Sequence, residues 1–391
     1  MPRLAVIGLG GRISGMLATM RELDPEISIA AVADPRIDEK RLETLGAGAA
    51  KRFASVAALI AEGGRYDGYV VGTRCDLHAD VACAVAPLGA PLFLEKPVAI
   101  TDDQATRLAA AWRGREDQVV VSFPLSSTPL FRAVHEVVRS GRLGQVNQIQ
   151  AFNYVTYGGV YFGQWYRDHD LTGGLWLQKA THDFAYLVLL AAAEPVAVAA
   201  VGTRLVFGGD MPPELTCSTC DRTATCPESP VNQAARGDNG GMGAGDHACA
   251  FSSSIRNDDA SSALIVFANG LHVAYSQNFV SRRSAGARGA RITGHRATLE
   301  FDWYRDAFTV TDHFDHRVDR VEVKPAGGHS GGDSQLARDF IAVVRGGRSH
   351  TDLHAGLQSA RLCLAARTSA QTHTFQTIAG AAAVPAVAAR R

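Results

Sequence analysis

The first 123 residues alternate between short, continuously apolar runs and segments with helical periodicity. Each apolar run is brief and bounded by turn residues, which favours strands over buried helices. Strands that are apolar on both faces and separated by helices predict a parallel sheet covered on both sides. The expected strands are 3–8, 27–33, 67–72, 91–94 and 118–123, with helices expected at 12–23, 55–62, 77–86 and 102–113.

The pattern changes after Pro124. Strand-like runs now follow one another directly, and Asn269-Gly270 between two alternating runs is a strong hairpin signal. The expected strands are 146–156, 196–207, 263–267, 271–279, 297–301, 308–311 and 318–323, with helices at 129–140, 173–192, 333–345 and 355–372. We therefore predict an α/β protein with a doubly wound parallel sheet in residues 1–123. An α+β domain with a large, mostly antiparallel sheet follows in residues 124–379, and a disordered tail in 380–391.

Positive and negative charges balance in this chain, with 39 Lys and Arg residues against 39 Asp and Glu residues. A net charge of zero gives no field that would attract nucleic acid or an anionic membrane. The longest apolar stretch, 187–201, is interrupted by Glu194-Pro195 and is too short to span a bilayer. The chain opens directly on a strand, without the features of a signal peptide. We expect a cytoplasmic protein that binds a small molecule and associates as a homodimer or homotetramer.

A glycine-rich turn joins the first strand to the first helix. In the dinucleotide fingerprint G-x-G-x-x-G, the first glycine makes the turn and the second lets backbone N–H groups approach a pyrophosphate. Gly8 and Gly10 fit this pattern, Gly11 and Arg12 follow, and Ile13 stands in the third slot. That slot mainly governs the packing of helix on strand, so phosphate binding can survive the replacement. The turn predicts a Rossmann nucleotide site, with an ordinary strand–helix turn as the alternative.

An acidic residue ends the second strand. Asp34 lies where the fingerprint places a carboxylate that binds the ribose hydroxyls of the adenosine. A carboxylate there repels a 2′-phosphate and favours NAD, whereas Arg36, two residues later, would attract that phosphate and favour NADP. We expect NAD, with NADP as the alternative. A role for Asp34 as a turn or cap residue also remains open.

The segment Glu95-Lys96-Pro97 follows directly on a buried strand, at the sheet edge where α/β proteins bind ligands. Together with Ala33-Asp34-Pro35 and Gly331-Gly332-Asp333, it closely resembles the Gfo/Idh/MocA family of oxidoreductases, and the resemblance covers nearly the whole chain. It implies that Lys96 contacts the reacting oxygen of the substrate and that Glu95 helps to place the nicotinamide. It further implies that Thr73, Arg74 and His78 line the cofactor groove.

The resemblance also implies a catalytic histidine in the second domain. His182 matches the family's general acid/base, a task that suits an imidazole because its ordinary pKa lies near neutrality. Gln178 occupies the slot of the usual carboxylate, and Lys179 beside it resembles a subset of the family with a K-x-T-H sequence. Lys179 is expected to bind substrate or to depress the pKa of His182. Arg167 is a candidate substrate clamp, or a structural partner of Asp168.

Three cysteines cluster in the long, Gly-rich insertion 208–249. In a cytoplasmic protein such a cluster favours metal binding over disulfides. Cys217, Cys220 and Cys226, with Cys249 or the nearby His247 as the fourth ligand, predict a structural zinc that staples the insertion, and the same subset of the family tends to carry such a segment. Reduced cysteines on a flexible loop are the alternative.

These features lead to one preferred function and two alternatives. We expect hydride transfer between NAD(P) and a secondary alcohol or ketone of a sugar, sugar derivative or cyclitol. The first alternative is an NAD-dependent elimination or glycosidic cleavage without net redox change, which the missing acid at Gln178 keeps open. The second is a nucleotide-binding regulator without catalysis. Lys96 and His182 argue against the regulator.

Overall fold

The computed structural model describes residues 1–237, 246–324 and 328–380. The chain forms two compact units, a first unit of residues 1–132, 184–186 and 325–361 and a second unit made of the rest. Each is described by itself. Within the described residues, no helix is long and apolar enough to cross a membrane. Most of the predicted tail, 381–391, lies outside the described residues.

The first unit contains a six-stranded sheet of order β3-β2-β1-β4-β5-β6, with all strands parallel. Its strands are β1 (Arg3–Ile7), β2 (Ser28–Ala33), β3 (Lys51–Phe53), β4 (Gly68–Val71), β5 (Leu92–Leu94) and β6 (Val119–Val121). The order reverses between β1 and β4, which is the point where doubly wound sheets bind their ligands. The predicted Rossmann architecture is confirmed.

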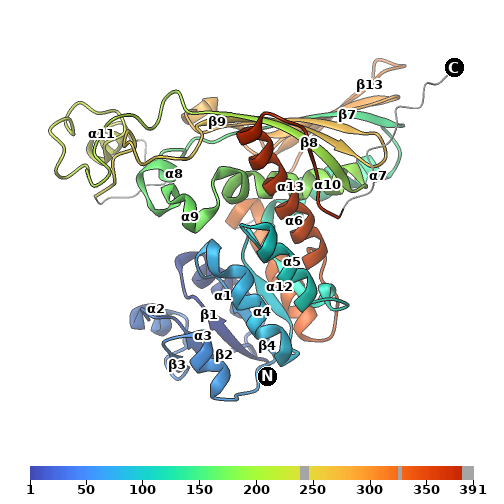
Figure 1. Ribbon diagram of the computed structural model, residues 1–391. Helices are drawn as coiled ribbons and strands as arrows, with labels where there is room; N and C mark the ends of the chain where they lie inside the picture. Colours follow the sequence, from blue (N-terminus) through green and yellow to red (C-terminus); the bar gives the residue numbers. More distant parts are fainter. Residues whose placement is uncertain (238–245, 325–327, 381–391) are drawn as a thin grey trace. The chain divides into compact units, whose positions relative to one another are not determined.

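Helices cover both faces of this sheet (Figure 1). They are α1 (Gly11–Leu23), α2 (Glu39–Thr44), α3 (Val56–Ala61), α4 (His78–Val85), α5 (Asp102–Ala111) and α6 (Pro124–Ser127). Strands β1, β4 and β5 are buried along almost their whole length, as parallel strands covered on both sides must be. Asp38, Ser55 and Thr101 cap the N-termini of α2, α3 and α5 by accepting a backbone N–H.

A late segment of the chain completes the first unit. Helix α12 (Gly332–Val344) packs beside α1, and the Phe340 ring meets Phe93 of β5 edge to face at 5.7 Å between centroids. Helix α13 (Leu353–Thr372) begins in the first unit and ends in the second. The first unit therefore draws on residues beyond the predicted boundary at 123, because α12 buries an apolar face on the parallel sheet.

The second unit contains a nine-stranded sheet of order β14-β13-β12-β11-β7-β10-β9-β8-β15. Every neighbouring pair is antiparallel except β7 and β10. The strands are β7 (Val146–Tyr154), β8 (Pro195–Thr203), β9 (Ala260–Phe267), β10 (His272–Asn278), β11 (Ala287–Gly294), β12 (Ala297–Asp302), β13 (Ala307–Asp312), β14 (Val318–Glu322) and β15 (Gln376–Thr377). The mostly antiparallel sheet and the hairpin at Asn269-Gly270 are confirmed.

The remaining helices are short. They are α7 (Pro129–Arg139), α8 (Val160–Gly163), α9 (His169–Thr172), α10 (Thr181–Ala191) and α11 (Pro230–Ala235). The single helix predicted over 173–192 is wrong in its first part. Gly173 and Gly174 have positive φ, and a π-helical turn, Trp176–Ala180, precedes α10. The structure contains one chain, so the expected homodimer or homotetramer stays a prediction.

Candidate active site

The turn after β1 requires glycine at its first position. Gly8 has φ +82°, and a Cβ there would lie 2.8 Å from the backbone of Gly72 and Thr73. Its N–H donates to the carbonyl of Ala33 at 2.9 Å, which ties the turn to the end of β2. Gly8 therefore lets the ends of three adjacent strands, β1, β2 and β4, approach one another closely.

The N-terminus of α1 is open to an incoming group. A Cβ on Gly10 or Gly11 would meet no atom within 4 Å. Among the residues that the structure describes, no side chain caps this helix. Unpaired backbone N–H groups and the positive end of the helix dipole make such a terminus a site for phosphate. These two predicted residues thus stand where a pyrophosphate would lie.

Ile13 in the third fingerprint slot has a counterpart on the neighbouring strand. A Cβ on Gly72, directly after β4, would lie 2.0 Å from Cγ1 of Ile13. Ile13 is buried and fills that space. Here the small residue that allows α1 to pack closely is Gly72 at the end of β4, and not a glycine in α1. The packing function of the third glycine is therefore retained.

Asp34 is held by the backbone of the same edge. Its Oδ2 accepts from the N–H of Leu9 at 2.9 Å, and its Oδ1 accepts from the N–H of Arg36 at 2.8 Å. Each carboxylate oxygen can accept a further hydrogen bond, so both can still receive ribose hydroxyls. Asp34 can therefore both stabilise the turn and accept hydrogen bonds from ribose hydroxyls. Arg36 is exposed.

Arg12 lies between two carboxylates. Its Nε is 3.1 Å from Oε1 of Glu95 and its Nη1 is 2.8 Å from Oδ1 of Asp333, while Nη2 donates to Ser122 Oγ at 3.1 Å. Burial alone would lower the pKa of Arg12, but Glu95 and Asp333 raise it. Arg12 thus fixes Glu95 at the end of β5 and joins it to the start of α12.

Lys96 is half-buried directly after Glu95 and precedes a cis peptide bond to Pro97. His78, predicted to line the cofactor groove, is instead buried beneath this edge. Its ring nitrogens lie 2.8 Å from the Pro97 carbonyl and 3.1 Å from that of Thr73. Burial lowers the pKa of His78, against the two carbonyls that favour a protonated ring. His78 therefore links the loop after β4, at Thr73, to the loop after β5, at Pro97. Of the other two residues predicted to line the groove, Thr73 is half-buried and Arg74 is exposed.

In the second unit, Lys179 and His182 lie three residues apart across the junction of the π-turn and α10. Lys179 is 4% exposed. Its Nζ is 2.5 Å from the hydroxyl of Tyr157 and lies 4.5 Å and 5.7 Å from the ring centres of Tyr157 and Tyr161. Burial lowers the pKa of Lys179 well below its ordinary value, and the charge of Arg288 lowers it further. The amine thus lies in an aromatic, largely dry environment.

A buried carboxylate anchors α10 beside His182. Asp183 has no exposed surface, and its Oδ2 accepts from Asn153 Nδ2 at 2.7 Å and from the Tyr275 hydroxyl at 2.9 Å. Its Oδ1 accepts from Arg288 Nε at 2.8 Å. These donors stand on β7, β10 and β11, the middle of the nine-stranded sheet. Asp183 therefore fixes the helix turn that carries Lys179 and His182.

Comparison with known proteins identifies the family of this chain. Residues 2–123 match the model of an oxidoreductase family with an NAD-binding Rossmann fold, and residues 131–300 match the GFO/IDH/MocA C-terminal domain. The chain belongs to the Gfo/Idh/MocA family. It is therefore an NAD(P)-dependent dehydrogenase with an NAD-binding domain, as the sequence predicts.

Individual relatives of this family member are distant. The oxidoreductase YteT of Bacillus subtilis (strain 168) is 26% identical over 70% of this chain and 71% of its own length. Inositol 2-dehydrogenase of Rhizobium meliloti (strain 1021) is 25% identical over 36% of this chain and 41% of its own length. A levoglucosan dehydrogenase, solved with NADH and levoglucosan, has the same fold with a TM-score of 0.75 at 17% identity, covering 97% of this chain and 99% of its own.

Arg167 has structural partners in this Gfo/Idh/MocA protein. Its Nη1 donates to the carbonyl of Cys249 at 3.2 Å and its Nη2 to Ser254 Oγ at 2.8 Å. The guanidinium thus ties the segment before α9 to the end of the insertion. Its role as a substrate clamp stays a prediction, and the ion pair with Asp168 is replaced by these two contacts.

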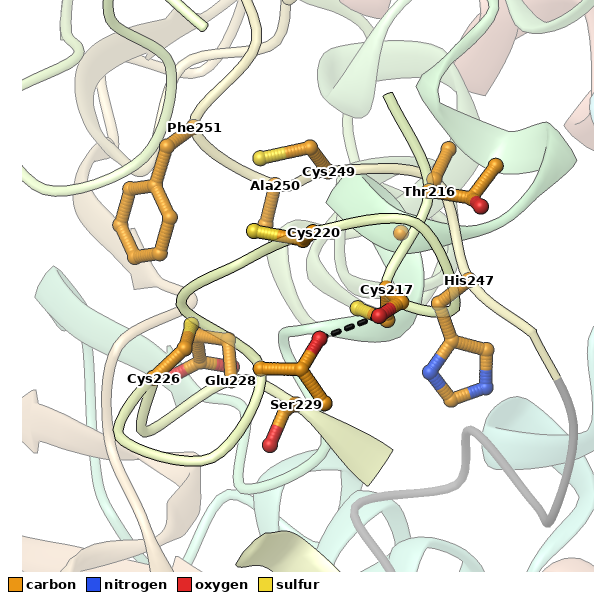
Figure 2. Close-up of a pocket in the computed structure, with 13 residues that line it drawn as sticks. Thr216, Cys217, Cys220, Cys226, Glu228, Ser229, His247, Cys249, Ala250 and Phe251 are labelled. Carbon is orange, nitrogen blue, oxygen red and sulfur yellow. Dashed lines mark hydrogen bonds between the residues drawn. The ribbon is translucent and has the colours of Figure 1, made fainter. Parts of the chain in front are cut away.

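The four cysteines of the insertion line one small pocket together with His247 (Figure 2). Burial raises the pKa of Cys217 to about 11, and the sulfurs of Cys226, Cys249 and Cys220 add to the shift. In the part of the chain that the structure describes, no group of three or more His, Cys, Asp or Glu side chains is arranged to hold a metal ion. The predicted zinc site is therefore not supported, although the four thiols do converge.

Protein contacts fasten the insertion instead. The N–H of Cys217 donates to the carbonyl of His247, and that of Cys249 to Leu215, each at 2.8 Å. The amide of Asn232 donates to three carbonyls of the cysteine loop at 2.9–3.1 Å. These bonds, together with α11, hold the insertion in place through the protein's own contacts.

Sequence reasoning missed Tyr157, Asp183 and Arg288. Asp183 adjoins His182, so its position on the helix is plain in the sequence, but its partners come from three strands whose register the sequence does not reveal. Arg288 is the second residue of β11, a strand that is hard to recognise because its sequence is rich in Arg and Gly. Tyr157 lies in an aromatic-rich loop after β7, a compositional signal that could have found it.

Proposed function

We propose that this dehydrogenase oxidises a secondary alcohol of a sugar, sugar derivative or cyclitol with NAD, or reduces the corresponding ketone. One observation carries the proposal: the carboxyl edge of the parallel sheet holds the open α1 terminus after β1, the carboxylate of Asp34 after β2 and the pair Glu95-Lys96 after β5. The named activities of inositol 2-dehydrogenase and levoglucosan dehydrogenase support the substrate class.

In this proposal Lys96, His182 and Lys179 each have a separate role in the reaction. Bound NAD supplies the hydride acceptor. Lys96 holds the substrate oxygen and stabilises negative charge on it, an effect worth on the order of 10²–10³-fold in rate. A ring nitrogen of His182 takes the hydroxyl proton, which is worth about 10²–10⁴-fold. Lys179 binds the substrate beside His182.

The cofactor preference follows from Asp34. Its oxygens accept two backbone N–H groups and remain acceptors, which suits ribose hydroxyls and repels a 2′-phosphate. We propose NAD over NADP, with Arg36 as the residue that would favour NADP. A binding titration decides this: an NADP affinity well above that of NAD would overturn the role of Asp34.

A screen of sugars and cyclitols for NADH formation tests the reaction. Lys96→Ala and His182→Ala should abolish oxidation and leave NAD binding largely intact. Lys40→Ala and His316→Ala are matched controls, because both residues are exposed and lie outside the proposed site. Full activity in either active-site variant would overturn the assignment. Turnover without net NADH formation would favour the elimination reaction instead.

A further inference from the structure

The buried charges around Lys179 do not balance. Among the described residues, no carboxylate lies within 4.0 Å of Lys179 Nζ, although the residue is only 4% exposed. Its hydrogen-bond contact is the hydroxyl of Tyr157. A buried cation without an opposite charge is costly, so this position favours either a neutral amine or an anionic partner that the protein itself does not supply.

Arg288 leaves a second donor unused. Its Nε donates to Asp183, but its Nη2 is buried and has no hydrogen-bond partner within the described part of the chain. Burial would lower the pKa of Arg288, yet the adjacent Asp183 raises it, so the guanidinium is charged. A buried, charged donor without an acceptor is unfavourable, because it has lost its hydrogen bonds to water and gained none in the protein. Arg288 is also near enough to lower the pKa of Lys179.

Asp183 does not satisfy both cations. Its oxygens already accept three hydrogen bonds, from Asn153, Tyr275 and Arg288. With Lys179 protonated, the cluster of Lys179, Arg288 and Asp183 has two positive charges and one negative charge. The surplus is a single positive charge. Lys179 Nζ and Arg288 Nη2 could both donate hydrogen bonds to an anion.

We propose that Lys179 and Arg288 bind an acidic group of the substrate, so that the substrate is a sugar acid or a cyclitol carrying a carboxylate. The proposal rests on the proposed dehydrogenase function and names its substrate class. A carboxylate matches the surplus of one charge, whereas a phosphate with a charge of about −2 would exceed it. The Tyr157 hydroxyl, in contact with Nζ, is placed to share the same hydrogen-bonded group.

Binding should be coupled to proton uptake. When the anion arrives, the Lys179 amine takes one proton from solvent and becomes the ammonium that pairs with the carboxylate. Among the described residues, Arg288 of β11 and Asp183 of α10 act on the pKa of Lys179, the rings of Tyr157 and Tyr161 adjoin it, and His182 lies three residues further along the chain. The charge of Asp183 raises the pKa of Arg288, which stays protonated, so the uptake is assigned to Lys179.

Calorimetric titration of the full chain saturated with NADH tests the proposal without turnover. The probes are D-glucuronate against D-glucose, and quinate against myo-inositol. At least one acid should bind about tenfold or more tighter than its neutral counterpart. Titrations in buffers of different ionisation enthalpy should show proton uptake with that acid. Equal affinities for acid and neutral probe in both pairs, or no saturable binding of either acid, would overturn the proposal.

Variants assign the effect to the named lysine. Lys179→Met should remove the preference for the acid and the proton uptake, and Lys179→Arg should keep the preference but lose the uptake. Lys324→Met, an exposed lysine of the same unit, is the matched control and should behave as wild type. NADH binding and circular dichroism establish that each variant is folded. An unchanged acid preference in folded Lys179→Met would also overturn the proposal, whereas acid binding without oxidation of any alcohol would overturn only the proposed reaction.

Discussion

Each unit is organised around one ionic hub, and the two hubs have opposite charge patterns. In the first unit a single cation, Arg12, lies between Glu95 and Asp333. In the second unit a single carboxylate, Asp183, receives three donors, with Arg288 and Lys179 nearby. The Arg12 side chain is 30% exposed and that of Asp183 is 0% exposed. The first hub has a surplus of negative charge, and the second has a surplus of positive charge when Lys179 is protonated.

This difference suits the two proposed ligands, NAD at the first unit and an acidic substrate at the second. The negative hub fixes Glu95 beside Lys96 and balances a cation within the protein itself. The positive hub leaves donor capacity unused, which is what a binding site for an anionic group requires. Burial sets how strongly each hub is coupled to stability, because charges in a dry environment are little screened by water.

The largest expected effect is at the buried hub. Asp183→Asn keeps the shape of the side chain but leaves Arg288 as an uncompensated buried charge. We expect a loss of about 3–5 kcal/mol in the free energy of unfolding, measured by urea denaturation. Asp170→Asn is the control, because Asp170 is paired with Arg256 at the surface and is 83% exposed. A loss at Asp183 no larger than that at Asp170 would break the comparison.

Arg12→Met should have the next largest effect. It removes a charge-assisted hydrogen bond to Glu95, worth about 1.5–3 kcal/mol, and an ion pair with Asp333, but the two carboxylate side chains keep 10% and 15% exposure. We expect a loss of about 2 kcal/mol in stability, together with weaker NAD binding because Glu95 is no longer fixed. If Arg12→Met cost as much as Asp183→Asn, burial would not be what separates the two hubs.

How far the sequence predicts each hub depends on the distance along the chain between its members. Glu95-Lys96-Pro97 and Gly331-Gly332-Asp333 are local motifs, so the sequence alone points to both carboxylates of the Arg12 hub. The Asp183 hub joins a helix to three strands, and its geometry depends on the register that sets Arg288 opposite Asn153.

Two further features show the same limit of local patterns. Ile13 departs from the fingerprint in sequence, and only the fold reveals that Gly72, on another strand, compensates for it. The zinc prediction relies on the spacing of the thiols, which does not fix where their side chains point. Motifs that lie within a few residues are therefore predictable here, whereas contacts that depend on the register of distant segments are not.

Lys179 should make the unfolding free energy depend on pH through the second hub. Its pKa is lowered in the folded state, so the unfolded chain binds a proton that the folded chain does not in the window between the lowered pKa and the ordinary value near 10.5. Stability contributed by this site is therefore fully present above pH 10.5 and is lost as the pH falls from there towards the folded pKa. Lys179→Met should remove a slope of at most about 1.4 kcal/mol per pH unit from the unfolding free energy.

Urea denaturation of wild type and Lys179→Met at a series of pH values measures this slope. At neutral pH the variant should be the more stable protein, because it no longer buries an amine. Lys324→Met should leave the profile of the wild type unchanged. A difference between wild type and Lys179→Met that stays constant with pH would show that Lys179 titrates alike in both states, which would contradict its buried environment.

The smallest expected effect is that of salt on the stability costs of Arg12→Met and Asp183→Asn. At 1 M ionic strength the screening length is about 3 Å, so a partly exposed ion pair weakens while a fully buried pair does so much less. Raising NaCl from about 0.1 M to about 1 M should therefore shrink the cost of Arg12→Met by less than about 1 kcal/mol and leave that of Asp183→Asn nearly unchanged. Both are differences between variant and wild type at the same salt, so general effects of NaCl on hydrophobic burial cancel. Equal salt dependence of the two costs would mean that solvent reaches both hubs alike, and that the second hub is not dry enough to need an anionic ligand.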